Sequence, residues 1–272
     1  MSLKDKKLFL LDMDGTIYEG ARLFECVNEF LAHIESVGGQ YVFITNNSSR
    51  SVKDYVIKLS NMGIKVTEDN FFTSSQATAL YLNKHFPDKK IYCMGTRSMI
   101  AEMEKYGVNI TTEADEDTDC ICVGYDTELT YKKLWDVSYL LQTKKDIPYI
   151  ATNPDRVCPT DQKVVLVDCG SICECLAHAT GRRPDITLGK PDPNMLSGIL
   201  TRFGYEADEI AMVGDRIYTD IEMAHNAGAF GVLVLSGETT LEVCDAAPKQ
   251  PHLVCDSIEV LGELVKEAHG LK

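Results

Sequence analysis

Two aspartates separated by a single residue follow the first apolar run of the chain. The run Leu8–Leu11 is typical of a short buried strand, and Asp12 and Asp14 come directly after it, ahead of Gly15. One carboxylate in such a pair can attack an electrophile or bind a metal ion, while the other transfers protons. Gly15 permits a tight turn away from the strand. Taken alone, the two aspartates are also compatible with a solvated turn, so the choice between a catalytic pair and a turn depends on other segments of the chain.

Two further acids follow another apolar run much later in the chain. Asp215 comes one glycine after the run Ile210–Val213, and Asp220 lies five residues further on. Ligands of open α/β sheets bind beyond the carboxyl ends of the strands, where Asp12 and Asp215 are both expected. Mg²⁺ prefers oxygen ligands and commonly takes one or two carboxylates together with substrate phosphate and water. Asp215 therefore fits the role of a metal ligand.

Two other segments are suited to binding an anion. Thr45 ends the apolar run 41–44 and offers a hydroxyl donor, and the backbone N–H groups after it, near the start of a helix, favour negative charge. Lys190 stands between a glycine and a proline just before another helical segment, so its backbone is held in place. A fixed cation near carboxylates is what a phosphoryl group requires. The structural alternatives are that the nearby serines only cap the helix after Thr45 and that Lys190 is an ordinary surface lysine.

Short apolar runs alternate with longer amphipathic stretches, a pattern typical of βα units around a mainly parallel sheet. The sequence therefore predicts an α/β fold. The expected strands are Lys7–Leu11, Gln40–Thr45, Ile91–Met94, Cys120–Val123, Tyr149–Ala151, Ile210–Val213, Gly231–Leu235 and Leu253–Cys255. The expected helices are Leu23–Ser36, Ser51–Asn61, Ser74–His85, Ser98–Tyr106, Tyr131–Thr143, Gly170–Thr180, Pro193–Phe203, Asp220–Ala227 and Ser257–Glu267.

Composition narrows the class of protein. The chain has 272 residues, enough for about two domains, and 44% of them are hydrophobic, so it can bury a core. With 27 Lys and Arg against 41 Asp and Glu, the net charge of −14 disfavours nucleic acid and anionic membranes as partners. No apolar run approaches the ~18 residues of a membrane span, and the start of the chain lacks a signal-like segment. We expect a cytoplasmic protein whose ten cysteines are reduced and mostly serve in packing.

Four motifs, taken in order, resemble those of the haloacid dehalogenase superfamily of aspartyl-phosphate enzymes. They are Asp-x-Asp-Gly-Thr at 12–16, Thr-Asn at 45–46, Gly-Lys-Pro at 189–191 and Gly-Asp-x-x-x-x-Asp at 214–220. The segments Ile-Thr-Asn-Asn-Ser-Ser-Arg and Ala-Thr-Asn-Pro-Asp are similar to those of the NagD-like p-nitrophenylphosphatase subfamily. The resemblance spans nearly the whole chain.

The resemblance implies a doubly wound, parallel-sheet, Rossmann-like core with an inserted α/β cap domain of the large C2 type. We expect the core over residues 1–80 and 185–272 and the cap over residues 81–184. The 144 residues between Thr45 and Lys190 agree with this division. They are too many for one crossover connection and enough for a domain of ~100 residues together with core elements.

The resemblance also implies roles for the acids. Asp12 would be the nucleophile that forms an aspartyl-phosphate, and Asp14 would protonate the leaving oxygen and then activate water. Asp12, Asp215 and the backbone carbonyl of Asp14 would bind Mg²⁺. Asp220 would support the metal or Lys190 from nearby.

The resemblance also implies which residues would contact the substrate. Thr45, the backbone of Asn46 and Lys190 would hold the oxygens of the transferred phosphoryl group. In the cap, Asn153 and Asp155 match the family's Thr-Asn-Pro-Asp segment and are candidates for binding the rest of the substrate. An Asx-type turn containing proline is the structural alternative for that segment.

These assignments predict a Mg²⁺-dependent phosphatase acting on a small phosphorylated metabolite, with no nucleic-acid or membrane partner. Sugar phosphate, nucleotide, glycerol phosphate and pyridoxal phosphate all fit. A phosphotransferase or mutase on the same scaffold would differ only in the acceptor of the phosphoryl group, and the sequence leaves that alternative open. A phospho-accepting signalling module also uses clustered aspartates, but Asp14 and the inserted segment argue against it. A homodimer is consistent with the resemblance.

Overall fold

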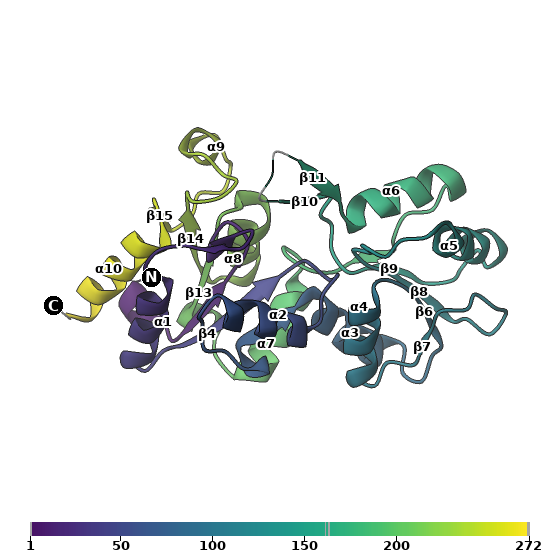
Figure 1. Ribbon diagram of the computed structural model, residues 1–272, viewed down its shortest axis with the longest axis horizontal. Helices are drawn as coiled ribbons and strands as arrows, with labels where there is room; N and C mark the ends of the chain where they lie inside the picture. The colour runs from purple at the N-terminus through teal and green to yellow at the C-terminus, as the bar shows by residue number, and fades with distance from the viewer. Residues whose placement is uncertain (1, 161, 163, 271–272) are drawn as a thin grey trace. The chain divides into compact units, whose positions relative to one another are not determined.

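The computed structural model describes residues 2–160, 162 and 164–270 and confirms the α/β class (Figure 1). The chain divides by compactness into two units. Unit 1 comprises Met1–Ile44, Lys58–Phe72 and Leu196–Lys272, and unit 2 comprises Thr45–Ile57 and Thr73–Met195. The expected domain boundaries, with a cap over residues 81–184, stay a prediction.

The first sheet has six strands in the order β15-β14-β13-β1-β4-β5. Their bounds are Leu8–Leu11 for β1, Gln40–Thr45 for β4, Phe71–Thr73 for β5, Ile210–Gly214 for β13, Phe230–Val234 for β14 and Leu253–Cys255 for β15. β1 pairs in parallel with both β13 and β4, and sequence order runs outward from it in both directions. The sheet is therefore doubly wound, and Asp12 leaves β1 beside the point where the strand order reverses, where such sheets bind ligands.

The apolar runs of β1, β4, β5, β13 and β14 are buried on both faces, as helices on either side of a parallel sheet require, whereas Val254 on the edge strand β15 is exposed. The helices that belong wholly or partly to unit 1 are α1 (Val27–Ser36), α2 (Val52–Asn61), α7 (Pro193–Phe203), α8 (Glu222–Ala227), α9 (Leu241–Asp245) and α10 (Ile258–His269). α1 and α10 pack together, and the ring of Phe30 on α1 meets that of Phe9 on β1 edge to face, with ring centroids 6.2 Å apart.

The start of α1 differs from the expectation. A helix over Leu23–Ser36 is predicted, but the structure pairs β2 (Tyr18–Glu19) with β3 (Arg22–Leu23) in an antiparallel hairpin. Gly20, with a φ of 62°, permits the turn between them. Two-residue strands are too short to show a periodic pattern, so the helical stripe downstream of the hairpin masks them.

The second sheet, in unit 2, has five strands in the order β12-β9-β8-β6-β7. Their bounds are Ile91–Met94 for β6, Ile110–Thr111 for β7, Cys120–Val123 for β8, Tyr149–Ala151 for β9 and Ile186–Thr187 for β12. The helices of this unit are α3 (Ser74–His85), α4 (Arg97–Lys105), α5 (Tyr131–Thr143) and α6 (Cys169–Thr180).

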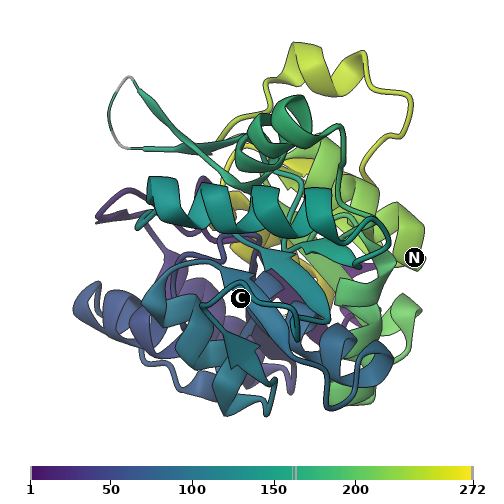
Figure 2. The ribbon, with the colours of Figure 1, turned by 90° about the vertical axis from the view of Figure 1, so that its right-hand side faces the viewer.

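Side chains along the strands of this sheet alternate between its two faces, and each face packs into its own hydrophobic core. Tyr92 and Ile121 belong to one core together with residues of α5 and α6, whereas Cys93 and Cys122 belong to the other together with residues of α3 and α4. Successive side chains of a strand point to opposite faces, so each face buries its own pair of helices. The result is a three-layer α/β/α unit, seen from another side in Figure 2.

Capping residues next to a helix explain why some helices have the bounds predicted from the sequence. α3 begins where Thr73 Oγ1 accepts a hydrogen bond from the Gln76 N–H (3.2 Å) and Gln76 Oε1 accepts one from the Thr73 N–H (2.9 Å). This capping box satisfies two backbone donors that a helix start leaves without partners. α5 and α7 also have their predicted bounds.

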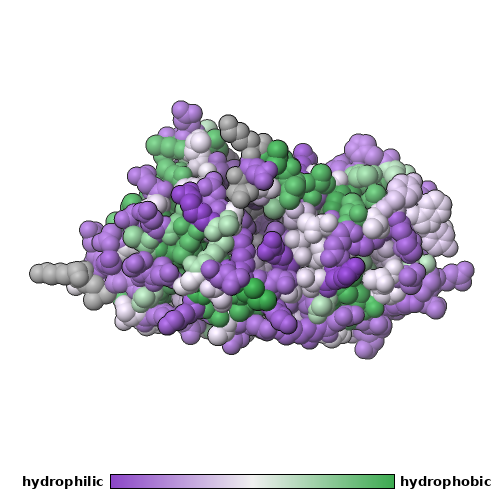
Figure 3. All heavy atoms as spheres, in the orientation of Figure 1, coloured by the Kyte–Doolittle hydropathy of each residue, from purple (hydrophilic) through white to green (hydrophobic). Residues whose placement is uncertain are grey.

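An antiparallel hairpin of β10 (Val157–Pro159) and β11 (Val165–Val167) precedes α6 and was not among the expected strands. Its aliphatic side chains lie at the surface, with Leu166 47% and Val167 63% exposed. Elsewhere the face in Figure 3 is mostly hydrophilic, with smaller hydrophobic groups between. Within the described ranges, the helices are all too short or too polar to cross a membrane.

Candidate active site

Three buried carboxylates, which we call the carboxylate cluster, meet at the carboxyl ends of β1 and β13. One oxygen from each of Asp12, Asp215 and Asp220 lies within 4.8 Å of the others, and the side chains are 8%, 2% and 0% exposed. The Asp12 N–H donates to the Val213 carbonyl (2.9 Å), so the sheet pairing of β1 and β13 fixes how the first two approach. Among the described residues this is the one group of three or more potential metal ligands.

The environment of Asp215 fits a divalent cation. The Glu238 N–H donates to its Oδ2 (2.7 Å), while its Oδ1 is buried without a hydrogen-bond partner in the described part of the chain. The pKa of Asp215 is raised to about 8, first by burial and then by the charges of Asp12 and Asp220. A bound cation would remove both the repulsion and the unpaired acceptor. The donor set, all oxygen, is the one Mg²⁺ prefers.

Two glycines leave room for this carboxylate. A Cβ on Gly15 would lie 2.5 Å from Asp215 Oδ2, and one on Gly237 would lie 2.0 Å from it. Gly15 also has a φ of 84°, which side-chain-bearing residues rarely adopt. Gly15, which the sequence marked as a turn residue, therefore also makes space for the Asp215 carboxylate.

Asp220 reaches the cluster through an irregular turn. A π-helical segment, Ile217–Ile221, separates β13 from α8. The Arg216 N–H donates to Asp220 Oδ2 (3.1 Å), and a Cβ on Gly214 would lie 2.2 Å from the Asp220 carboxyl carbon. π-Helical turns occur frequently at functional sites. The sequence assigned Asp220 a supporting role, and the structure places its carboxylate within the cluster itself.

Asp14 lies on a tight turn just after β1. The Gly15 N–H donates to the Tyr18 carbonyl (2.9 Å), and the Tyr18 hydroxyl donates to Asp14 Oδ2 (3.2 Å). Loss of water around the carboxyl group raises the pKa of Asp14, while Lys58 opposes that rise and Asp12 adds to it. A carboxyl group that keeps its proton to higher pH can serve as a general acid.

Two cations near these acids were not found from the sequence. The Lys58 ammonium lies 3.6 Å from the centre of the Tyr18 ring, the ring whose hydroxyl bonds Asp14. The Arg216 guanidinium pairs with Glu238 at 2.9 Å. Arg216 stands beside the motif residue Asp215 and could have been noticed there. Nothing in the sequence connects Lys58, on α2, with Asp14.

A second set of predicted residues, the amide–lysine group of Thr45, Asn46 and Lys190, lies in unit 2. The Lys190 N–H donates to Asn46 Oδ1 (2.6 Å), and Asn46 Nδ2 donates to the Lys190 carbonyl (3.0 Å). One side-chain amide thus fixes the backbone of a lysine 144 positions away. The backbone of Lys190 is held as the glycine and proline around it predicted.

Thr45 and Lys190 are both buried side chains that carry a donor group. Thr45 is the last residue of β4, and its Oγ1 accepts from the Asn47 N–H (3.1 Å), which leaves the hydroxyl proton available. Lys190 is 3% exposed. A Cβ on Gly189, whose φ is 81°, would lie 2.7 Å from Asn46 Oδ1, so only glycine allows this approach.

The two cap candidates have different surroundings. Asn153 is fully buried: its Nδ2 donates to Asp168 Oδ1 (3.0 Å), and its Oδ1 accepts from the Thr152 hydroxyl (2.9 Å). Asp155 is partly exposed, and its Oδ1 accepts from Asn46 Nδ2 (3.4 Å). Of the two, Asp155 lies nearer the amide–lysine group, whereas both polar ends of the Asn153 amide are bonded within the protein.

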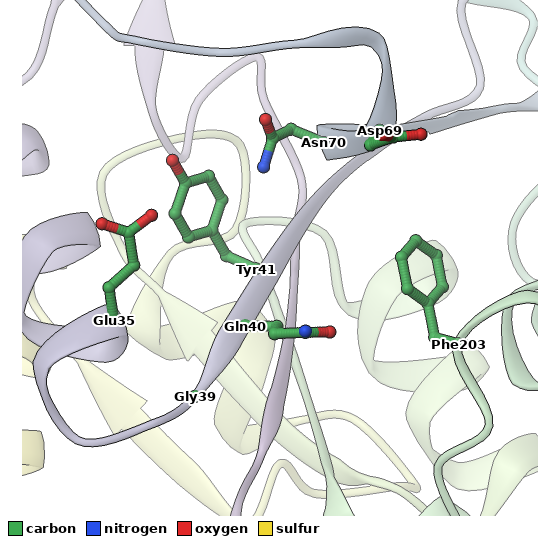
Figure 4. A pocket seen from close by; sticks show the side chains of 7 residues that line it. All are labelled: Glu35, Gly39, Gln40, Tyr41, Asp69, Asn70 and Phe203. Atoms are coloured by element: carbon green, nitrogen blue, oxygen red, sulfur yellow. The ribbon is translucent and has the colours of Figure 1, made fainter.

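A cavity of about 290 Å³ in unit 1 is not part of this chemistry (Figure 4). Gln40 and Tyr41 line it together with Glu35, Asp69 and Phe203. Gln40 begins β4, so the cavity lies at the amino ends of the strands, opposite the edge where Asp12 and Asp215 emerge. Parallel sheets bind substrates at the carboxyl ends, which leaves this cavity outside the candidate site.

Family comparisons agree with this arrangement. Residues 9–109 match the haloacid dehalogenase-like hydrolase model, and residues 187–261 match a second model of HAD-hydrolase-like proteins. The 5'-nucleotidase YutF of Bacillus subtilis is 33% identical over 256 residues, which cover 94% of this chain and 97% of that protein. The chain belongs to the haloacid dehalogenase-like hydrolases.

Solved structures place it within the NagD-like p-nitrophenylphosphatase subfamily. A 4-nitrophenylphosphatase from Thermotoga maritima is 39% identical, with a TM-score of 0.91 over 97% of this chain and 98% of that one. NagD from E. coli is 29% identical, with a TM-score of 0.84 over 95% and 98% of the two chains. This haloacid dehalogenase-like hydrolase is therefore a phosphoric monoester hydrolase.

A metal-bound relative bears on the cofactor. A glycerol phosphate phosphatase from Mycobacterium tuberculosis, solved in complex with magnesium, is 25% identical with a TM-score of 0.87. The match covers 96% of this chain and 78% of that one. Together with the all-oxygen carboxylate cluster, this favours Mg²⁺ as the ion that this family member would hold.

Proposed function

We propose that this protein is a Mg²⁺-dependent phosphatase that hydrolyses a small-molecule phosphate monoester through an aspartyl-phosphate intermediate. The observation that carries the proposal is the carboxylate cluster, three buried acids whose oxygens lie within 4.8 Å of one another beside an acid of raised pKa. Buried like charges are costly unless a cation balances them. A cation held there is suited to neutralising phosphoryl oxygens during transfer.

In the first step an oxygen of Asp12 attacks phosphorus, and the bond between phosphorus and the leaving oxygen breaks. Asp14 gives its proton to that oxygen, which departs as an alcohol. In the second step Asp14, now ionised, takes a proton from water as the water oxygen attacks phosphorus. The bond between Asp12 and phosphorus breaks, and inorganic phosphate leaves.

The remaining residues bind and orient. Asp12, Asp215 and the Asp14 carbonyl would hold Mg²⁺, with Asp220 beside them, and the ion would supply charge neutralisation. Thr45, the Asn46 backbone and Lys190 would bind phosphoryl oxygens, because a hydroxyl, an N–H and an ammonium are the donors that such oxygens accept. Fixed donors of this kind act through positioning, which phosphoryl transfer needs most.

The substrate class follows from the relatives. Those that match over most of this chain are named 5'-nucleotidase, phosphoglycolate phosphatase, acid sugar phosphatase and 4-nitrophenylphosphatase, and these names all denote enzymes for small phosphate esters. We therefore infer a small phosphorylated metabolite for this chain. Asp155 of the cap segment is the candidate to contact the part of the substrate beyond the phosphate, with Asn153 supporting that segment from within.

The test is phosphate release from p-nitrophenyl phosphate and a panel of phosphorylated metabolites, with Mg²⁺ or with EDTA. We expect Mg²⁺-dependent turnover that Asp12→Asn abolishes and that Asp256→Asn, an exposed control with the same change of charge, leaves intact. Turnover that survives EDTA would refute the metal dependence. A phosphoprotein that persists without turnover would instead favour a signalling role, and transfer to added alcohols in place of water would favour a phosphotransferase.

Rapid acid quenching tests the intermediate separately. With ³²P-labelled substrate, wild-type protein should carry label during turnover, and Asp12→Asn should carry none. Asp14→Asn should lose turnover while it still accepts label from a good leaving group, because p-nitrophenolate departs without a proton. Label on Asp12→Asn would show that another residue is the nucleophile.

A further inference from the structure

The cavity in unit 1 that Gln40 and Tyr41 line is close in size, at about 290 Å³, to the smaller ligand pockets of proteins. At about 30 Å³ for each water-sized group, it has room for roughly ten non-hydrogen atoms. Gln40 is paired with Leu8 of β1, and Asp12 comes four residues after Leu8. At ~3.3 Å per residue, Gln40 is therefore roughly 13 Å from Asp12 along the sheet. A ligand in this cavity would not reach the carboxylate cluster.

Tyr41 brings a buried hydroxyl to the wall of this cavity. The residue is 7% exposed, and its hydroxyl has no hydrogen-bond partner within residues 2–160, 162 and 164–270. The pKa of Tyr41 is raised first by burial and then by the charge of Glu35, so the Glu35 carboxylate is near enough to act on the hydroxyl. Figure 4 shows both groups on the same side of β4. Because buried polar groups are nearly always hydrogen-bonded, we expect the partner of this hydroxyl to be a molecule in the cavity.

Glu35 gives this side of the cavity a negative charge. It lies in the last turn of α1, and its carboxylate forms no ion pair with any residue that the structure describes. The chain as a whole has a net charge of −14, which attracts cations and repels anions. An unpaired carboxylate beside a hydroxyl oxygen therefore favours a positively charged ligand.

The other side of the cavity holds a cation of the protein itself. There Asp69 pairs with Arg202 (3.1 Å), and the Arg202 guanidinium lies 4.9 Å from the centre of the Phe203 ring. An acid and an aromatic ring together bind one cation, as cation–π geometry allows. Glu35 and Tyr41 are also an acid and an aromatic side chain, but no lysine or arginine in the described part of the chain pairs with them. A cation from solution would complete the same arrangement.

We propose that this cavity binds a small organic amine in its ammonium form, whose N–H groups donate to the Tyr41 hydroxyl oxygen and to the Glu35 carboxylate. A primary ammonium has three donors, which is enough for both acceptors. The hydrocarbon part of the amine fills the rest of the cavity. Such a ligand is not a substrate, because it stays a strand's length away from Asp12. Its binding requires no phosphate chemistry, so the site stands or falls separately from the proposed function.

Saturation-transfer NMR with three probes of similar shape tests the charge of the ligand. Benzylammonium, benzyl alcohol and benzoate carry the same ring with a positive, a neutral and a negative group. The wild type should bind benzylammonium in the millimolar range and at least about tenfold more tightly than benzyl alcohol, because charge-assisted hydrogen bonds are the stronger ones. Benzoate should bind more weakly than either. Equal affinity for benzylammonium and benzyl alcohol would overturn the proposal.

Variants locate the bound ammonium. Tyr41→Phe should weaken benzylammonium binding by at least about tenfold, because it removes an acceptor from a charged donor, and Glu35→Gln should weaken it by about fivefold, the effect of one partly exposed ion pair. Glu29→Gln, the same change of charge at an exposed position of α1, should leave binding unchanged.

Folding of the variants is checked by their melting temperatures. Tyr41→Phe removes only a hydroxyl without a partner among the described residues, so its melting temperature should match that of the wild type. Benzylammonium binding that survives both Tyr41→Phe and Glu35→Gln would contradict the proposal. A loss of affinity in Glu29→Gln as large as that in Glu35→Gln would do the same, because it would show attraction to the net charge of the chain alone.

Discussion

Asp215→Asn should stabilise the metal-free protein, although it removes a residue of the proposed active site. In EDTA the Asp215 carboxyl is buried beside Asp12 and Asp220, which holds its pKa at about 8, against an ordinary value of 3.8. The folded state therefore keeps a proton that the unfolded state has already lost. Asparagine can still accept the Glu238 N–H bond and brings no charge to the cluster.

The sign and the size of this change in folding stability follow from the linkage between folding and protonation of Asp215. For an acid whose pKa is raised by folding, stability is highest below pH 3.8 and falls as the pH rises towards 8. Each pH unit costs up to about 1.4 kcal/mol, so the wild type should lose at most roughly 4 kcal/mol between pH 5 and pH 8. At roughly 2–4 °C per kcal/mol, this corresponds to a fall in Tm on the order of 10 °C.

Calorimetry in EDTA is the suitable assay, since the lone tryptophan, Trp135, lies in unit 2 and Asp215 lies in unit 1. The wild-type Tm should fall from pH 5 to pH 8 more steeply than that of Asp215→Asn, and Asp256→Asn should follow the wild type. Addition of Mg²⁺ should flatten the wild-type curve and leave Asp215→Asn nearly unchanged. Parallel curves for the wild type and Asp215→Asn in EDTA would refute the idea that this carboxylate lacks a compensating partner.

Two further predictions concern the remaining groups. Lys58→Met should raise the apparent pKa of Asp14 in the pH–rate profile more than Tyr18→Phe does, because the charge of Lys58 lowers this pKa more than the Tyr18 hydrogen bond does. Equal profiles for both variants and the wild type would contradict this. Gly189→Ala should cost well over the ~1 kcal/mol of a left-handed alanine and also lower kcat/KM, because its Cβ would meet an amide oxygen of the amide–lysine group. Gly181→Ala, with a similar φ and open space around it, is the matched control in chemical denaturation and should cost only that strain.

The sequence predicted the buried strands of both sheets well because parallel strands buried on both faces are continuous apolar runs. β4, β6 and β8 have their predicted bounds for this reason. The predicted carboxylates of the cluster were also found together, since the acids of parallel strands emerge at one edge of a sheet. What the pattern could not supply is contact between distant segments. The approach of Lys58 to Tyr18 depends on where α2 packs, and no local spacing encodes it.

Short or irregular elements were missed for a related physical reason. The two-residue strands around Gly20 and the β10–β11 hairpin are too short or too exposed to give a burial pattern. The π-helical turn carrying Asp220 was read as the start of an ordinary helix over Asp220–Ala227, because 3.6-residue periodicity does not distinguish the two. The position of Asp220 within the cluster follows from that turn.

The two hydrogen bonds between Asn46 and Lys190 limit which parts of this chain can change in sequence and length during evolution. The part of the chain after β5 can be lengthened, shortened or reshaped between them, provided that its far end returns to the same amide. Residues that choose the substrate can therefore vary across the intervening segment without disturbing the lysine's backbone. A chain that stops short of Gly189 lacks that lysine and also β13, β14 and β15, so the chemistry becomes available only when synthesis has passed the whole intervening segment.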